Sequence, residues 1–235
     1  FLALGIGLAT GRPAVLVTTS GTASVELHPA VVEAHQAGVP LLAVTADRPP
    51  ELHDVGAAQT VDQRHLYGRA VRWFTDPGVP DAAAAGTWRS LAARSVAEAT
   101  TGAAGPGPVQ VNLPFREPLV GTARPLPPAR PDGAAWHTTD GRRGSVDRAG
   151  TERLAALLDV DRGVVVAGAG AGEPGPVLEL ARATGWPVLA DPRSGCRLPD
   201  DVVVSAADAI LRHRPTAAAL SPEVVVRVGE PPASK

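Results

Sequence analysis

Several residue types are scarce in this chain of 235 residues. It has one cysteine, Cys196, no methionine and only 3% aromatic residues. A single cysteine excludes an internal disulfide framework and a zinc site built from several cysteines. Only Lys235 among the 22 basic residues is a lysine, and the net charge of −2 gives no signature of nucleic-acid or anionic-membrane binding. No apolar run is long enough to span a bilayer. We therefore expect a cytoplasmic protein that binds neither nucleic acid nor membrane.

The residues that are present indicate an α/β fold. Apolar residues make up 44% of the chain and charged residues 20%, which suits a packed globular core. Continuous β-branched runs predict strands over 13–19, 39–45, 71–74, 109–113, 163–168, 186–191 and 224–229. Helical spacing predicts helices over 21–38, 81–99, 151–158, 176–185 and 206–212. Alternation of strands and helices with short loops is typical of parallel sheets.

A proline-rich stretch separates two halves of this pattern. Six prolines lie between Pro114 and Asp132, and such a segment is stiff and extended because proline cannot donate to a strand ladder. We predict one domain over 1–119, an interdomain linker over 120–145 and a second domain over 146–235. The first residues resemble the middle of a helix, and the last residues have no closing element, so we expect an internal piece of a longer protein.

A polar motif, Thr18 to Ala23, follows the first predicted strand and opens a helix. Unpaired N–H groups at a helix start attract polar or anionic ligand groups. The alternative is that Ser20 or Thr22 simply caps the helix.

A second motif, Thr45 to Leu52, follows the second predicted strand, where ligands of open parallel sheets bind. Two prolines after Arg48 fix its backbone, so its guanidinium is suited to clamp a carboxylate. The alternative is a structural ion pair of Arg48 with Asp47 or Glu51. In the next loop, the amide of Gln59 offers a donor and an acceptor to a ligand. The alternative is a loop amide that is hydrogen-bonded only to solvent.

The loop Gly170–Gly175 fits the dinucleotide-binding pattern of glycines between a strand and a helix, and the next predicted strand ends at Asp191. Two observations weaken this interpretation. The surrounding segment is so rich in glycine that a match arises easily, and Pro174 removes one of the helix-start N–H groups that would meet a pyrophosphate.

Together these motifs resemble the MenD family. The resemblance is carried by residues 19–34, 38–52, 56–59, 112–119, 162–168 and 185–187, and the stretch 45–51 (Thr-Ala-Asp-Arg-Pro-Pro-Glu) is its most specific part. MenD enzymes are thiamine-diphosphate enzymes of menaquinone biosynthesis. They decarboxylate 2-oxoglutarate and add the resulting carbanion in 1,4 fashion to isochorismate.

The resemblance implies a fold and an assembly. Residues 1–119 would be a pyrimidine-binding domain that lacks its N-terminal part, and 146–235 part of a Rossmann-like central domain. Thiamine diphosphate and Mg²⁺ would bind between subunits of a homodimer or homotetramer. The glutamate that activates the cofactor and the motif that binds metal and diphosphate lie outside this chain. The chain alone is therefore expected to be inactive, and it is assigned no metal ligand.

The resemblance also implies roles for single residues. Arg48 and Lys235 would bind substrate carboxylates, and Gln59 would act as a catalytic residue that hydrogen-bonds the reacting substrate. Ser20, Gly21 and Thr22 would form the wall around the aminopyrimidine of the cofactor.

Two other functions remain open at this point. One is another thiamine-diphosphate enzyme, similar to acetolactate synthase, and the other is a non-catalytic dinucleotide-binding α/β protein. The sequence also departs locally from the family, which often has asparagine, tyrosine and asparagine where Glu26, His28 and Ala58 stand.

Overall fold

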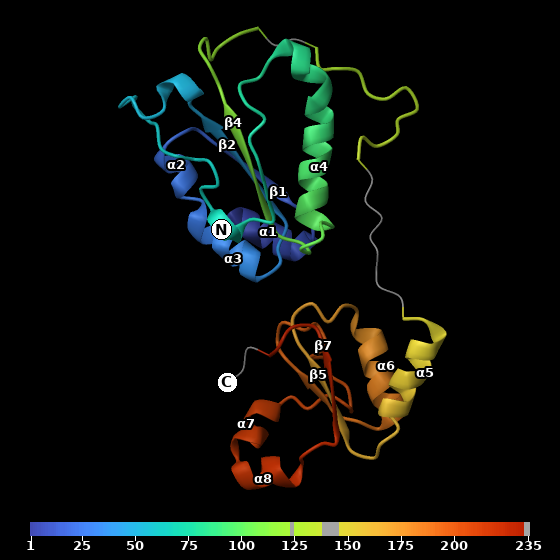
Figure 1. Cartoon of the computed structure of the whole chain (residues 1–235). Helices are drawn as coiled ribbons and strands as arrows, with labels where there is room; N and C mark the ends of the chain where they lie inside the picture. The colour runs from blue at the N-terminus through green and yellow to red at the C-terminus, as the bar shows by residue number, and fades with distance from the viewer. Residues whose placement is uncertain (123–124, 138–145, 233–235) are drawn as a thin grey trace. The chain divides into compact units, whose positions relative to one another are not determined.

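The computed structural model describes residues 1–122, 125–137 and 146–232, and the chain forms two compact units, Phe1–Arg142 and Arg143–Lys235. Each unit contains one parallel sheet with helices packed against it (Figure 1). The predicted parallel-sheet α/β class is therefore confirmed. Part of the predicted linker over 120–145 lies outside the described residues. Within those residues, no helix has the length and apolar character needed to cross a membrane.

The first unit is built around a four-stranded sheet in the order β1-β2-β4-β3. Its strands are β1 (Ala14–Thr18), β2 (Leu41–Asp47), β3 (Trp73–Thr75) and β4 (Pro108–Pro114). Its α-helices are α1 (Leu2–Thr10), α2 (Thr22–Val25), α3 (His28–Gln36) and α4 (Trp88–Thr100). Its 3-10 helices are η1 (Pro50–Leu52), η2 (Gly68–Ala70) and η3 (Ala82–Thr87).

Alternate residues of β2 supply the two cores of this unit. Leu41 and Ala43 pack with Val31 of α3 on one face. Leu42 packs with Ala99 of α4 on the other face, and Figure 1 shows α4 apart from α1 and α3. This arrangement follows from the two-residue period of a strand. Because both faces of β2 are covered, it becomes the central buried strand that the continuous apolar run predicted.

Two predictions for the first unit are wrong in detail. The helix predicted over 21–38 is divided into α2 and α3, because Pro29 has no N–H to donate to the carbonyl four residues earlier; the break falls at Glu26 and Leu27, and Pro29 lies in the first turn of α3. The strand predicted as buried over 13–19 is the edge strand β1, and its side chains Val15 and Val17 are 59% and 75% exposed. Only its inward-facing side chains pack against the core.

The second unit contains a three-stranded sheet in the order β6-β5-β7. Its elements are α5 (Arg148–Leu157), β5 (Gly163–Ala167), α6 (Pro174–Thr184), β6 (Val188–Ala190), α7 (Ala207–Arg212), α8 (Arg214–Ala219) and β7 (Val224–Val228). The first strand lies between the second and the third, as at the switch point of a doubly wound sheet. Helix α8 was not predicted; His213 interrupts the helical backbone and Pro215 begins a new turn.

Tyr67 connects the core of the first unit to the turn before α3. Its ring is 2% exposed, and its hydroxyl donates a 2.7 Å hydrogen bond to the Ser24 carbonyl. Burial raises the pKa of the Tyr67 hydroxyl, so the group stays protonated and remains a donor.

We expect Tyr67→Phe to destabilise the first unit. The substitution removes the hydrogen bond from the hydroxyl, while the Ser24 carbonyl keeps the N–H of Leu27 at 3.4 Å; loss of one such hydrogen bond costs about 0.5–1.5 kcal/mol. Urea unfolding followed by circular dichroism measures the change. An unchanged midpoint and slope would contradict the interpretation.

The core of the second unit depends on a glycine. Trp186 is 1% exposed, and a Cβ at Gly163 would overlap with carbon atoms of its indole ring. We therefore expect Gly163→Ala to destabilise the unit by about 1–3 kcal/mol, as overpacking does.

Gly175→Ala is the matched control for this prediction. It lies in α6, has ordinary helical backbone and open space around its Cβ position, so it should keep or raise the melting temperature. Equal effects of the two substitutions in calorimetry would refute the steric argument.

Candidate active site

The ends of three strands bring the predicted residues to one edge of the first sheet. Thr18 at the end of β1 pairs with Thr45 of β2, and Asp47 at the end of β2 pairs with Pro114 of β4. Because the strands are parallel, the segments that follow them emerge at the same edge. The segment after β1 contains Ser20, Gly21 and Thr22, and the segment after β2 contains Arg48 and Gln59.

Gln59 lies directly on the turn after β1. Its Nε2 donates to Thr19 Oγ1 at 2.9 Å and to the Ser20 carbonyl at 3.0 Å. Gly21 has φ +82°, and a Cβ there would come within 2.9 Å of Gln59 Cγ. Glycine therefore provides both the left-handed backbone and the close approach. The structure thus brings together Ser20, Gly21 and Gln59, which the sequence pattern selected separately.

Thr22 is exposed and begins the single turn of α2. The prediction that Ser20 or Thr22 caps a long helix is wrong. The N-cap residue is Gly21, which has no side chain, and its carbonyl instead accepts a 2.7 Å hydrogen bond from Ser24 Oγ.

Gln59 also has an unusual backbone. Its φ is +58°, a left-handed conformation that residues other than glycine rarely adopt. Conformations of this kind are held in place by the surrounding contacts and concentrate at functional sites. The two hydrogen bonds of its side chain provide such contacts.

Arg48 has neither of the structural partners that the sequence left open. The Asp47 carboxylate accepts from the backbone N–H of Arg48 at 2.7 Å. Glu51 is instead held by both Nε and Nη2 of Arg116, the latter at 2.9 Å. The hydrogen bond from Arg116 lowers the pKa of the Glu51 carboxyl to about 2. Both acidic neighbours are therefore engaged elsewhere.

The guanidinium of Arg48 is left available for a ligand. Over the described ranges its side chain has no ion-pair partner, and its Nε is buried without a hydrogen-bond acceptor. The backbone around it is well held, since His53 Nε2 lies 3.0 Å from the Arg48 carbonyl and Pro49 and Pro50 follow. A buried donor without an acceptor is unfavourable, and a carboxylate offers acceptors in the geometry that a guanidinium fits.

A buried polar network below this edge was not predicted. Asn112 Oδ1 accepts from Thr45 Oγ1 at 2.9 Å and from Gln63 Nε2 at 3.1 Å, and Asn112 Nδ2 donates to Asp47 Oδ2 at 2.8 Å. A signal was present in the sequence, because Gln110 and Asn112 interrupt the apolar strand run over 109–113. Polar residues in a buried strand are more informative than the apolar residues around them.

The glycine-rich loop of the second unit packs against its own chain. A Cβ at Gly168 would overlap with the Glu230 carbonyl, and the Glu230 N–H donates to the Ala169 carbonyl at 2.9 Å. The acidic residue expected to meet a ribose, Asp191, is 6% exposed and already accepts from the Arg193 N–H at 2.8 Å. Backbone packing thus explains Gly168, whereas Gly170 and Gly172 have positive φ and open space at their Cβ positions. The engagement of Asp191 is what disfavours a dinucleotide site.

A cavity of about 950 Å³ lies beside β6, and residues 168–175 do not line it. Its arginines are already engaged: Arg193 with Asp191, Arg212 with Asp208, and Arg197 with the Ser205 carbonyl. The cavity therefore does not restore the dinucleotide interpretation.

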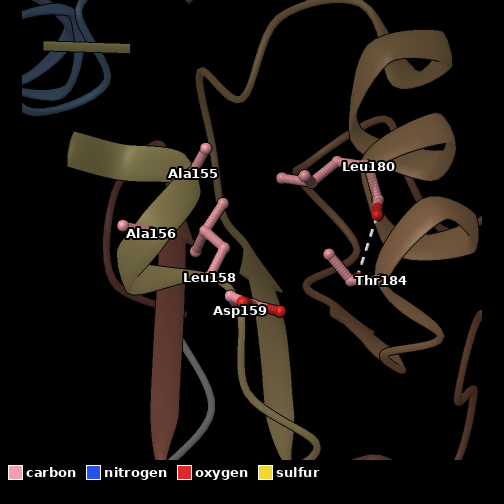
Figure 2. Close-up of a pocket in the computed structure, with 6 residues that line it drawn as sticks. All are labelled: Ala155, Ala156, Leu158, Asp159, Leu180 and Thr184. Atoms are coloured by element: carbon pink, nitrogen blue, oxygen red, sulfur yellow. Dashed lines mark hydrogen bonds between the residues drawn. The ribbon is translucent and has the colours of Figure 1, made fainter. Parts of the chain in front are cut away.

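A hollow of about 540 Å³ lies between α5 and α6, and Figure 2 shows the residues that line it. Its walls are mostly apolar, and the hydroxyl of Thr184 donates to the Leu180 carbonyl at 2.9 Å. The hollow contains none of the predicted site residues, and we assign it no function.

Two further predictions concern Lys235 as a carboxylate ligand and the absence of metal ligands in this chain. Lys235 lies outside the described residues. No group of three or more His, Cys, Asp or Glu side chains suited to a metal ion occurs in the part of the chain that the structure describes.

Comparison with known proteins adds a family to this geometry. Residues 1–66 match the family described as thiamine pyrophosphate enzyme, N-terminal TPP binding domain. The whole chain is 47% identical to the 2-succinyl-5-enolpyruvyl-6-hydroxy-3-cyclohexene-1-carboxylate synthase of Thermobifida fusca and covers 42% of that protein. It is 44% identical to the synthase of the same name from Geobacillus kaustophilus and 43% identical to that of Haloquadratum walsbyi, and covers 42% and 40% of them. The chain thus spans about two fifths of the length of these relatives. Over its whole length the chain is thus similar to MenD synthases, and its first 66 residues match the thiamine pyrophosphate enzyme family.

Proposed function

We propose that the whole protein decarboxylates 2-oxoglutarate and adds the four-carbon product in 1,4 fashion to isochorismate, giving 2-succinyl-5-enolpyruvyl-6-hydroxy-3-cyclohexene-1-carboxylate. The relatives named above are synthases of this product. The observation that supports the proposal best is Arg48, whose buried Nε has no acceptor and whose acidic neighbours are engaged elsewhere. Both proposed substrates carry carboxylates, and one of them would satisfy this donor.

The cofactor that we propose is thiamine diphosphate. When bound, it supplies a carbon nucleophile and an acceptor for the electron pair released with carbon dioxide. Ser20, Gly21 and Thr22 would form one wall for its aminopyrimidine ring. Gly21 supports this role because it keeps the wall free of a side chain at the point where Gln59 packs. These residues fit one side of the cofactor only, and other parts of the whole protein would complete the site.

Mg²⁺ is proposed for the whole protein but not for this chain. The described residues contain no cluster of acidic or histidine side chains that fits it. We therefore place its ligands outside the described residues and assign it no step here.

The side chains at the sheet edge would position the substrates. Arg48 would bind a substrate carboxylate. Gln59 uses its Nε2 within the protein, and its Oε1 has no partner within the described residues, so this oxygen is free to accept a hydrogen bond from a substrate hydroxyl. Lys235 is proposed as a second carboxylate ligand. Holding both substrates in place lowers the entropic part of the barrier.

The proposal extends to the assembly and location of the protein. The family resemblance implies a site shared between subunits, so we propose a homodimer or homotetramer. A cytoplasmic location rests on the cysteine content of the chain.

The decisive experiment follows isochorismate absorbance in the whole protein with thiamine diphosphate and Mg²⁺, with and without 2-oxoglutarate. We expect loss of absorbance that requires 2-oxoglutarate. Turnover of pyruvate without isochorismate would instead support an acetolactate-synthase-like enzyme. Saturable NADH binding without either reaction would support the dinucleotide-binding alternative.

Removal of the Arg48 guanidinium should weaken substrate use strongly. We expect Arg48→Ala to lower kcat/KM for the carboxylate substrate at least about tenfold, which corresponds to about 1.4 kcal/mol. Arg48→Lys should recover only part of this loss, because an ammonium group cannot form the bidentate pair.

Arg94→Ala is the control for this prediction. Arg94 is exposed on α4 and pairs with Glu98, so its loss should leave the kinetic constants unchanged. Equal kcat/KM for Arg48→Ala and wild type would disprove the carboxylate clamp.

Gln59 offers a test that separates activity from stability. Gln59→Gly removes the amide and also relieves the left-handed backbone, whereas Gln59→Ala removes the amide and keeps the strain. We expect the glycine variant to be more stable than the alanine variant by about 1 kcal/mol, and both to lose activity. Urea unfolding and steady-state kinetics on the same samples measure this. A glycine variant with wild-type activity would show that the amide is not used.

A further inference from the structure

We propose that Gln63 is a positioning residue, which holds the turn at Gly21 in register with the end of β2 that carries Arg48. Gln63 was not selected by the sequence pattern, and it lies four residues beyond Gln59. This inference rests on the proposed function, because it assumes that the Gly21 turn faces the cofactor and that Arg48 faces a substrate.

The side-chain amide of Gln63 is fully buried and joins three segments. Its Oε1 accepts from the Gly21 N–H at 2.8 Å. Its Nε2 donates to the Ala46 carbonyl at 2.9 Å and to Asn112 Oδ1 at 3.1 Å. One amide therefore links the turn after β1 to the last residues of β2 and to β4.

The chain of hydrogen bonds continues from Asn112 to Arg48. Asn112 Nδ2 donates to Asp47 Oδ2 at 2.8 Å, and Asp47 Oδ1 accepts from the Arg48 N–H at 2.7 Å. The Gly21 and Arg48 backbones are thus connected through three side chains, Gln63, Asn112 and Asp47. Each of these three side chains forms hydrogen bonds with both of its neighbours in this series. The network therefore fixes the distance between the two segments.

The chemistry of an amide suits this position. The Gly21 N–H requires an acceptor, and the Ala46 carbonyl and Asn112 Oδ1 each require a donor. Glutamine supplies one carbonyl oxygen and two N–H donors in this order. The backbone of Gln63 is held as well, since its carbonyl accepts from Gln110 Nε2 at 2.7 Å. Buried polar groups of this kind are costly unless all are paired.

The link to function passes through Gly21. The Gly21 turn is the surface on which Gln59 rests, with its Nε2 bound to Thr19 and Ser20. If the Gly21 N–H loses its acceptor, the turn can shift and carry Gln59 with it. A shift of about 1 Å in a positioning group is enough to lower a rate about a hundredfold.

The test uses the whole protein with Gln63→Met, which keeps an unbranched side chain of similar length and removes the three hydrogen bonds. Val109→Ala is the matched control, because it creates a cavity in the core beside β4 without touching the network. Three quantities are measured: the Kd of thiamine diphosphate by calorimetry in the presence of Mg²⁺, kcat/KM for 2-oxoglutarate, and the melting temperature.

We expect Gln63→Met to raise the Kd of thiamine diphosphate and to lower kcat/KM, each at least about tenfold or about 1.4 kcal/mol. We expect Val109→Ala to lower the melting temperature and to leave both constants within about twofold of wild type. A general loss of stability would change Kd and kcat/KM in both variants. A change in Gln63→Met alone therefore reports on the positioning role.

Gln63→Glu keeps the test informative if the methionine variant does not fold. A protonated glutamic acid can accept from the Gly21 N–H and donate to Asn112 Oδ1, but an ionised one presents an anion to two carbonyl oxygens. The Ala46 and Asn112 oxygens, with Asp47 and Asp76 behind Asn112, would raise the pKa of this carboxyl. We expect the ratio of kcat/KM between variant and wild type to rise at least about threefold when the pH falls from about 8 to about 6.

The outcomes separate the two claims. The positioning role is overturned if folded Gln63→Met has a Kd and a kcat/KM within about twofold of wild type. It is also overturned if the ratio of kcat/KM between Gln63→Glu and wild type does not change with pH. Either result leaves the proposed function intact. If the wild type binds thiamine diphosphate but does not consume isochorismate, the proposed reaction is wrong, and the Kd comparison still decides the role of Gln63. If the wild type does not bind thiamine diphosphate at all, both claims are overturned.

Discussion

The amide of Asn112 is the group on which the first sheet edge depends. It is fully buried in β4, and its oxygen accepts from Thr45 and Gln63 while its nitrogen donates to Asp47 and Asp76. A buried amide must have such partners, because water cannot replace them. The requirement fixes the ends of β2 and β4 and the loop that contains Gln63 relative to one another. The segments that would meet cofactor and substrate are attached to these positions.

The availability of Arg48 depends on a second pairing nearby. Glu51 lies only three residues from Arg48, yet it is held by Arg116, which follows β4. The pair is exposed and contributes little to stability. In the proposed site its effect would be on specificity, because it removes an internal carboxylate that would otherwise compete with a substrate for the Arg48 guanidinium. The Asp47 carboxylate is likewise used by Asn112 and by the backbone.

The glycines of the two units show why one residue type has no single meaning. Gly21 allows Gln59 to rest on the turn after β1. The glycines at 168 and 229 instead let the loop after β5 and the end of β7 touch backbone to backbone. Packing therefore explains Gly168 and Gly229, whereas Gly170 and Gly172 of the same loop provide positive φ with open space at their Cβ positions. Only the surrounding chain distinguishes the two uses, since glycine provides close approach to whatever lies beside it.

The sequence by itself determined the parallel α/β class, the positions of the main strands along the chain and the choice of Ser20, Gly21, Arg48 and Gln59 as candidate site residues, because these follow from local periodicity and from motifs of a few adjacent residues. It did not determine the division between α2 and α3, the exposed face of β1, or the roles of Gln63 and Asn112. The tertiary structure alone decided that Glu51 pairs with Arg116 and that Gln63 meets Gly21, partners that lie 65 and 42 residues apart in the chain. Contacts over such separations depend on which strands become neighbours and in which register, and no local pattern specifies that.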